Sequence, residues 1–244
     1  AAEIENGVLE VGPGFGVLTK ELAKTGKKVV SVEVDKRLIP VLDFTLNGFD
    51  NVKIIEKDIL KTDVAELIEQ EFGDKTISVA ANLPYYITTP IITRLLESKL
   101  PLKNIVVMVQ KEVAERIAAE PGKKEYGAIS VLCRYYTKPR IVTTVPAGSF
   151  YPAPKVDSAV LCMEVSPAPN VVTKDEKLFF KVVKAAFGQR RKTLLNCLSN
   201  GFALDKQQLR DLLCRAGIFS STRQSAANVW DLRNLRGLPT KYTI

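Results

Sequence analysis

Short apolar runs alternate with amphipathic stretches along the first half of the chain. The run at residues 8–11 ends in glycines, and residues 17–24 have the apolar spacing of a helix. The alternation predicts further strands at residues 29–34, 52–56, 77–81 and 105–109, and further helices at 37–47, 64–71, 90–97 and 112–119. Strands separated by helices of this length predict an α/β fold, in which helices cover both faces of a parallel sheet.

The pattern changes near residue 140. Residues 141–145 and 158–164 predict two strands joined by a proline-rich segment, and hence a hairpin that adds an antiparallel edge strand to the sheet. A second proline-rich segment, residues 166–170, predicts a boundary between a domain of residues 1–168 and one of residues 169–244. The second domain is expected to be small and all-helical, with helices at 175–198, 205–216 and 225–235.

Charge is distributed unevenly between these two parts. The 244 residues carry a formal net charge of +8; residues 1–170 hold 21 basic and 22 acidic side chains, whereas residues 171–244 hold 14 and 5. A basic segment of this kind points to a polyanion, with nucleic acid ahead of a membrane surface. The alternative is that these cations are merely solvated.

Composition excludes several kinds of chemistry. The chain has no histidine, and its four cysteines form no Cys-X-X-Cys pair, which argues against a zinc site and against any mechanism that needs a histidine base. We expect no metal. Scattered cysteines are typical of reduced, buried thiols, and the first six residues do not resemble a signal peptide. Together these features predict a cytoplasmic protein.

Glycine and polar residues follow four successive predicted strands. Gly12, Gly14 and Gly16 form a turn after the first strand, while Glu33, Asp58 and Asn82 follow the second, third and fourth. Carboxyl ends of parallel strands line one crevice, so these residues are expected to converge. The glycine turn contains no lysine for phosphates, which favours a nucleoside ligand such as S-adenosylmethionine. A ligand-free turn with solvated acids is the alternative.

The segment Asn82-Leu-Pro-Tyr85 follows an apolar strand and predicts a pocket for a base. The Asn82 side-chain oxygen and the Leu83 carbonyl can each accept one N–H of an exocyclic amine, Pro84 stiffens the turn, and Tyr85 can stack on the ring. Phe150, on the proline-rich connection, is a candidate for the second stacking face. An ordinary turn, with both aromatic side chains packed inside, is the competing interpretation.

A stripe of cations lies on the first helix predicted after residue 170. Lys177, Lys181, Lys184 and Arg191 fall on one face of that helix, and Arg190 and Lys192 flank Arg191. Arginine suits phosphate because of its planar fork. We therefore predict RNA contact at Lys181, Lys184, Arg190, Arg191 and Lys192.

Taken together, these segments resemble the KsgA family of ribosomal small-subunit RNA adenine-N6,N6-dimethyltransferases over essentially the entire chain. The similarity rests on Val8-Leu-Glu-Val-Gly-Pro-Gly-Phe-Gly-Val-Leu-Thr19, Asn82-Leu-Pro-Tyr-Tyr86, Gln110-Lys-Glu-Val113, Pro154-Lys-Val-Asp-Ser158 and Phe187-Gly-Gln-Arg-Arg-Lys-Thr193.

The resemblance implies a Rossmann-like class I methyltransferase domain with a helical C-terminal domain. It implies S-adenosylmethionine as donor, and as substrate two adjacent adenosines in a hairpin near the 3′ end of small-subunit rRNA in the assembling 30S-type subunit. We expect a monomer with no membrane partner. Cofactor contacts carry over to Gly12, Gly14, Glu33, Asp58 and Asn82, and adenine contacts to Asn82, Leu83, Pro84, Tyr85 and Phe150.

One departure and two alternatives remain. Family members carry a Gly-Gln-Asn-Phe-Leu segment well before the glycine turn, which is not found in this sequence; weaker cofactor binding and RNA positioning are therefore expected of it. The related large-subunit methyltransferases of the macrolide-resistance type typically have Ile at the position of Leu83 and lack the Lys155-Val-Asp-Ser158 segment. A largely non-catalytic RNA-binding assembly factor is the other alternative.

Overall fold

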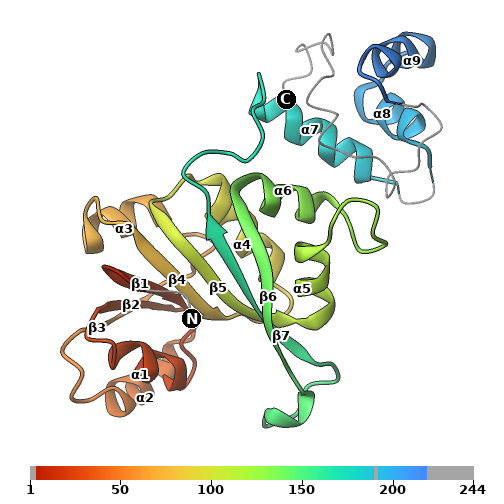
Figure 1. Cartoon of the computed structure of the whole chain (residues 1–244). Helices are drawn as coiled ribbons and strands as arrows, with labels where there is room; N and C mark the ends of the chain where they lie inside the picture. Colours follow the sequence, from red (N-terminus) through yellow and green to blue (C-terminus); the bar gives the residue numbers. More distant parts are fainter. Residues whose placement is uncertain (1–3, 190–191, 219–244) are drawn as a thin grey trace. The chain divides into compact units, whose positions relative to one another are not determined.

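A seven-stranded sheet dominates the computed structural model, which describes residues 4–189 and 192–218 (Figure 1). The strand order is β3-β2-β1-β4-β5-β7-β6, and the first five strands are parallel. The strands are β1 Gly7–Val11, β2 Lys28–Glu33, β3 Val52–Glu56, β4 Ile77–Asn82, β5 Leu102–Gln110, β6 Thr137–Val145 and β7 Ser158–Val165.

The helices that alternate with these strands confirm the predicted α/β pattern to within a few residues. Only the stretch at 37–47 differs, because it divides into a short 3-10 turn and a helix. The elements are α1 Val17–Ala23, η1 Lys36–Leu38, α2 Ile39–Thr45, α3 Val64–Phe72, α4 Thr88–Glu97 and α5 Lys111–Ala118.

The core of the sheet is covered on both faces. Every residue of β1 is buried, as expected of a central parallel strand between two helical layers. On one face, Leu22 of α1 packs against Val8 and Val29 of the neighbouring strands. The apolar runs identified in the sequence therefore form the buried strands at the centre of the sheet.

The hairpin is present, but its strands are arranged differently from our expectation. β7 is antiparallel to both of its neighbours and lies between β5 and β6. The antiparallel strand is thus one position in from the edge, and β6 is the edge strand. A register shift at Ile141/Thr143 leaves Val142 unpaired and half exposed, a local irregularity that discourages pairing with another chain.

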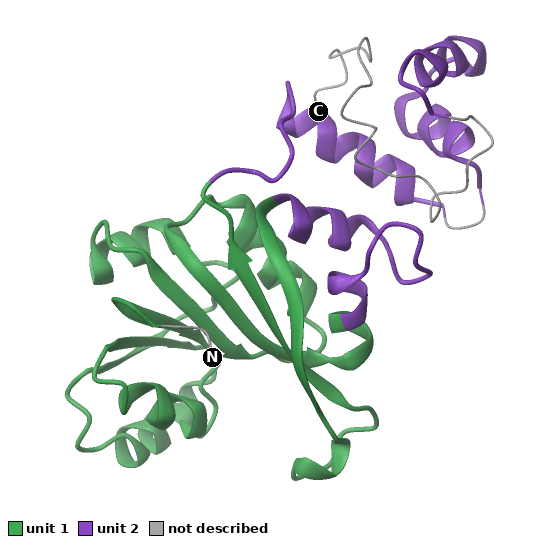
Figure 2. Cartoon of the chain, in the orientation of Figure 1, with its two compact units in different colours: residues 1–114, 136–167 green, residues 115–135, 168–244 purple. Residues whose placement is uncertain are grey.

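The chain divides into two compact units, coloured separately in Figure 2. The first comprises residues 1–114 and 136–167; the second comprises residues 115–135 and 168–244. Contacts thus place residues 115–135 with the C-terminal part of the chain rather than with the sheet.

Helix α6 (Ala128–Tyr136), which we did not predict, contributes to the second unit through an aromatic cluster. The Tyr135 ring stacks on Phe179 at a centroid distance of 5.5 Å and meets Phe180 edge-on at 5.0 Å. Arg134 donates to the carbonyls of Ala118 and Ala119 at 2.6 and 2.8 Å. Local propensity gave little sign of this helix, since its β-branched and aromatic residues favour strands; tertiary packing stabilises it.

Our prediction of one helix over residues 175–198 is wrong. The structure has two helices, α7 (Glu176–Phe187) and α8 (Leu194–Phe202), because Gly188 ends the first. The break lets α8 fold back on α7 closely enough that a Cβ on Gly201 would lie 2.5 Å from the Ala185 Cβ. The next helix, α9 (Lys206–Arg215), confirms the prediction at 205–216; the helix predicted at 225–235 lies outside the described residues.

Two further sequence expectations concern cysteines and membranes. Cys133, Cys162 and Cys197 are buried free thiols, and Cys214 is an exposed one. Within the described ranges, none of the helices combines the length and apolar character that crossing a membrane requires.

We predict that buried valines of β5 stabilise the fold far more than the same residue on the edge strand. Val107 is fully buried whereas Val142 is half exposed. Val107→Ala should lower the free energy of unfolding by about 2 kcal/mol, and Val142→Ala by less than about 0.5 kcal/mol. Urea denaturation of both variants measures the difference; equal losses would contradict the assigned burial.

Candidate functional site

The candidate site lies where the chain reverses its direction across the sheet. From β1 the chain runs outward to β3 and then returns to β4 on the other side of β1. Such a switch point leaves a crevice at the carboxyl ends of the strands. Glu10 is registered with Ala80 of β4, and Val11 with Val32 of β2. Gly12, Glu33 and Asn82 therefore stand at the same level on three adjacent strands.

The glycine turn after β1 is open to a ligand. Gly12, Gly14 and Gly16 have φ of +68°, +58° and +81°, values that L side chains rarely adopt. A Cβ added at Gly12 or Gly14 would meet nothing within 4 Å. The turn is nevertheless fixed, because the Gly12 N–H donates to the Val32 carbonyl at 3.0 Å.

Glu33 links this turn to the end of β2. Its buried carboxylate accepts the Gly14 N–H at 3.3 Å on one oxygen, and the N–H groups of Val34 and Asp35 at 2.8 and 2.9 Å on the other. The side chain therefore faces the glycine turn, as convergence of the strand ends requires.

Asp58 lies in a tight turn after β3. Its carboxylate accepts the Leu60 N–H at 2.9 Å, and Arg94 of α4 donates to the carbonyls of Leu60 and Thr62 at 2.5 and 2.6 Å. The sequence alone gives no sign of this role for Arg94. It ties the Asp58 turn to α4, the helix that follows the Asn82–Tyr85 turn.

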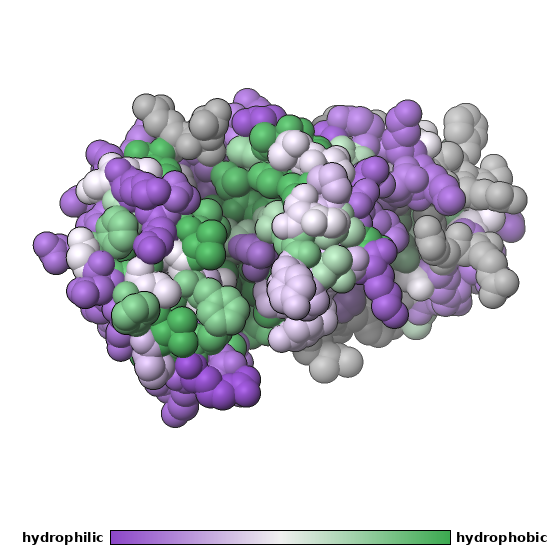
Figure 3. All heavy atoms as spheres, turned by 90° about the horizontal axis from the view of Figure 1, so that it is seen from below, coloured by the Kyte–Doolittle hydropathy of each residue, from purple (hydrophilic) through white to green (hydrophobic). Residues whose placement is uncertain are grey.

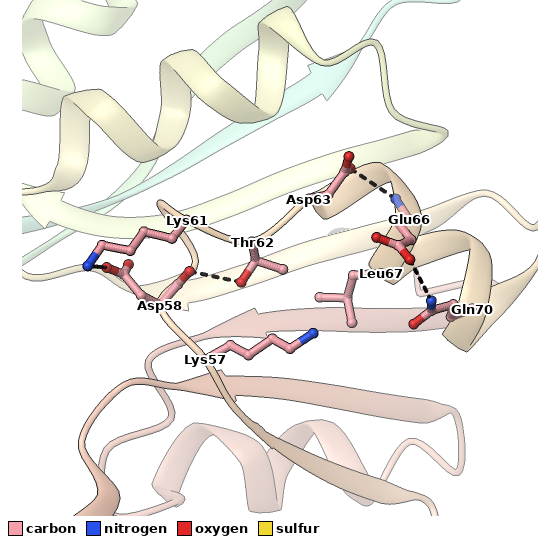
Figure 4. Close-up of a pocket in the computed structure, with 8 residues that line it drawn as sticks. All are labelled: Lys57, Asp58, Lys61, Thr62, Asp63, Glu66, Leu67 and Gln70. Atoms are coloured by element: carbon pink, nitrogen blue, oxygen red, sulfur yellow. Dashed lines mark hydrogen bonds and ion pairs between the residues drawn. The ribbon is translucent and has the colours of Figure 1, made fainter.

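A polar cavity of about 310 Å³ also borders this turn (Figure 4). Asp58, Lys61 and Thr62 line it from the turn, and Glu66, Leu67 and Gln70 from α3. Of the four strand-end positions that the sequence predicts to converge, Asp58 lines this cavity, whereas Gly12, Glu33 and Asn82 do not.

The turn Asn82–Tyr85 leaves β4 with one polar side chain outward and one apolar side chain inward. Asn82 is exposed and its side chain makes no hydrogen bond to the part of the chain described, whereas Leu83 is buried and donates its N–H to the Met108 carbonyl at 3.1 Å. The Pro84 carbonyl accepts the Thr88 hydroxyl at 3.1 Å. Tyr85 is half-buried, with its hydroxyl 2.9 Å from the Ser158 hydroxyl.

Exposed apolar side chains gather at this end of the sheet. Phe150 is half-buried after the 3-10 turn η2 (Ala147–Ser149). Apolar surface is prominent in Figure 3, which views the molecule from below. Several large side chains come from connections at the carboxyl ends of the parallel strands or from the β6–β7 connection: Phe15, Val34, Tyr86, Tyr151 and Val156. Single exposed apolar residues are ordinary, but a group at one edge indicates a binding surface.

The predicted RNA-contacting cations lie in the second unit. Lys177, Lys181 and Lys184 are all exposed along α7, opposite buried residues that include Phe179 and Val182. The prediction that the stripe continues along the same helix to residue 191 is wrong, because α7 ends at Phe187. Lys192 is exposed; Arg190 and Arg191 lie outside the described residues.

Glu10 is a buried acid beside the site that the sequence analysis overlooked. It is fully buried in β1, and one oxygen accepts the hydroxyls of Thr19 and Ser31 at 2.7 and 2.6 Å; the other has no partner among the described residues. Burial raises the pKa of this carboxyl, hydrogen bonds from Ser31 and Thr19 oppose the rise, and Glu33 adds to it. The sequence does contain a signal for this residue, because Glu10 is a single acidic residue within an apolar strand.

No group of three His, Cys, Asp or Glu side chains suited to a metal ion occurs within the described ranges.

Comparison with known proteins gives consistent matches. The family model "Ribosomal RNA adenine dimethylase" matches residues 3–221. Proteins named "Ribosomal RNA small subunit methyltransferase A" from Bacillus mycoides (strain KBAB4) and Bacillus cereus (strain B4264) are each 49% identical over 235 residues, covering 95% of this chain and 80% of their own length.

Two solved structures share the architecture. A dimethyladenosine transferase from Plasmodium falciparum has a TM-score of 0.76 at 25% identity, covering 95% of this chain and 88% of its own. The 23S rRNA methyltransferase ErmE has a TM-score of 0.71 at 24% identity, covering 96% and 91%. The second likeness concerns the fold alone.

We predict that neutralising Glu10 stabilises the protein at neutral pH. A carboxyl whose pKa is raised by folding contributes most to stability below its ordinary value of 4.5, and this contribution is lost as the pH rises through the folded-state pKa. Glu10→Gln should therefore raise the free energy of unfolding at pH 8, with a gain that shrinks toward pH 4.5.

Urea denaturation across this pH range measures the effect, and Glu69→Gln on the exposed face of α3 is the matched control. A difference between Glu10→Gln and the parent chain that stays constant with pH would contradict the assignment.

Proposed function

The chain belongs to the ribosomal RNA adenine dimethylase family, and from this premise we propose that it dimethylates N6 of two adjacent adenosines in a hairpin near the 3′ end of small-subunit rRNA. As a member of that family it is an rRNA methyltransferase. The names of its 49% identical relatives support the small subunit as target. The proposal assigns S-adenosylmethionine as the methyl donor.

The residues at the strand ends fit this donor. Gly12 and Gly14 leave open space where any other residue would carry a Cβ, which admits a ligand close to the backbone. Glu33 ends β2 at the place where an acid accepts hydrogen bonds from ribose hydroxyls. The turn from Gly12 to Gly16 contains no cation, which suits a donor that is itself positively charged and carries no phosphate.

When bound, S-adenosylmethionine supplies a methyl group on an electron-poor sulfonium sulfur. The chain's own task is to hold the acceptor amine, whose lone pair is delocalised into the adenine ring. We assign this task to the Asn82 side-chain oxygen and the Leu83 carbonyl, each accepting one N–H. Such acceptors favour the pyramidal nitrogen on which new charge develops. The amine then releases its proton to water, so no side-chain base is needed.

The aromatic side chains bind the base itself. Extruding an adenine from a folded RNA costs a few kcal/mol of lost stacking, and stacking on an aromatic side chain returns about 1–3 kcal/mol. We assign Tyr85 and Phe150 to the two faces of the adenine. Both are half-buried and are carried by hydrogen-bonded turns, so they lose little conformational freedom when the base binds.

The cations of the second unit are assigned to the RNA backbone. Lys181 and Lys184 stand on the exposed face of α7, and Lys192 is exposed shortly before α8. Phosphate contacts of this kind supply affinity without sequence information. Selection of the adenine is left to the crevice in the first unit.

The observation that carries the proposal is the exposed Asn82 amide, level with the glycine turn and without a partner in the described residues. We expect Asn82→Ala to lower kcat/KM for methyl transfer by roughly 10²–10³-fold, because it removes a hydrogen bond that strengthens in the transition state. RNA affinity should change little, since the RNA contact assigned to Asn82 is limited to the extruded base.

Labelled methyl transfer to under-methylated small subunits, followed by nucleoside analysis, measures the loss; a binding assay on the same RNA checks affinity. Asn47→Ala, which alters an exposed asparagine after α2, is the matched control. Normal dimethyladenosine formation by Asn82→Ala would refute the proposed chemistry.

For the second unit, we predict that replacing Arg190, Arg191 and Lys192 by Gln weakens RNA binding. The slope of log affinity against log salt concentration should become shallower by about one for each lost phosphate contact. The same change at Lys20, Lys27 and Lys75, exposed cations of the first unit, removes equal charge and is the control. Equal slopes for the two triple variants would assign the effect to net charge and contradict specific contact.

A further inference from the structure

Asp157 and Ser158 stand where β7 begins, beside both turns that carry the aromatic residues of the proposed adenine pocket. Ser158 is 1% exposed and is registered with Gln110 of β5 and Val145 of β6. Its backbone is therefore held between two neighbouring strands. Any group that bonds to this dipeptide is anchored to the sheet rather than to a loop.

Ser158 anchors the first aromatic residue. Its hydroxyl lies 2.9 Å from the Tyr85 hydroxyl, a contact between residues 73 positions apart in the chain. A tyrosine held at its backbone and at its hydroxyl cannot swing its ring to another χ1 position without breaking this bond. The position of the Tyr85 ring is thus set by β7 as well as by its own turn.

Asp157 anchors the second aromatic residue through the backbone. Its carboxylate accepts the N–H of Ala147 at 3.0 Å, and its own carbonyl accepts the N–H of Lys111 at 3.0 Å. Ala147 begins η2, and its carbonyl accepts the Phe150 N–H at 3.2 Å. Two successive hydrogen bonds therefore link the Asp157 carboxylate, through Ala147, to the backbone of Phe150.

We propose that Asp157 and Ser158 are positioning residues that together set the two stacking faces for the target adenine. This rests on the proposed function, in which Tyr85 and Phe150 contact the base. Two adjacent residues at the start of β7 thus hold two turns that are far apart in the sequence. Side chains held in this way lose less conformational entropy when the adenine binds. They also hold the adenine closer to the geometry that the reaction needs.

The test uses hydroxyl deletions at both ends of the Ser158–Tyr85 contact. Ser158→Ala and Tyr85→Phe should each lower kcat for methyl transfer to small-subunit RNA about threefold to tenfold, as expected for one lost hydrogen bond. The KM for S-adenosylmethionine should not change. The double variant should be no worse than either single variant, because both remove the same contact.

The second arm tests Asp157. Asp157→Ala removes the acceptor for the Ala147 N–H and should lower kcat by a similar factor, while Asp157→Asn keeps an oxygen there and should restore most of the activity. Ser78→Ala is the matched control: Ser78 is a buried serine on β4 whose hydroxyl has no partner in the described residues. It should leave kcat and KM unchanged.

Tyr85→Phe keeps its ring, so this variant remains informative even where Ser158→Ala folds poorly. Additive losses in the double variant, unchanged kcat in both single variants, or no rescue by Asp157→Asn would overturn the positioning role. In those cases the parent chain would still form dimethyladenosine, and the proposed function would stand. Failure of the parent chain to methylate the RNA would instead overturn the proposed function.

Discussion

The contact between Glu33 and the glycine turn is the constraint on which the candidate site depends. One carboxylate accepts N–H groups from Gly14, Val34 and Asp35, so the ends of β1 and β2 are held at a fixed separation. The Gly12–Val32 hydrogen bond fixes the start of the turn, and the Glu33 contact further limits the shapes that three glycines in the left-handed region would otherwise allow. The fold places parallel strands in register, and the hydrogen bonds of Glu33 fix the backbone where β1 and β2 end.

Glu10, in the strand that leads into the glycine turn, indicates that the site is not optimised for stability alone. An acid in the middle of a fully buried strand is unfavourable unless its hydrogen bonds offset desolvation, and here one oxygen has no partner among the described residues. Its two hydroxyl donors come from α1, the helix that follows the glycine turn, and from β2, the strand that carries Glu33. Residues that weaken a fold while joining the elements around a crevice are typical of functional sites.

The sequence predicted the sheet well because its strands are short apolar runs between clear turn signals. It also predicted that Gly12, Glu33 and Asn82 would share one edge, a consequence of parallel topology alone. Features that depend on contacts between distant segments could not be read from it. Helix α6 requires Phe179 and Phe180 to cover Tyr135, and the Arg94 and Ser158 contacts join residues more than 30 positions apart. Periodicity carries no information about such pairs.

The separation of charge between the two parts of the chain is consistent with the proposed chemistry. A cation beside the donor would repel a sulfonium over a short distance, where screening by salt is weak, and the turns at Gly12–Gly16 and Asn82–Tyr85 contain none. Phosphate attraction acts over longer distances and needs no precise geometry. Lysines on an exposed helix such as α7 can supply it. The two turns assigned to the donor and to the acceptor amine thus hold no cation, while the excess of basic over acidic residues lies after position 170, with 14 against 5.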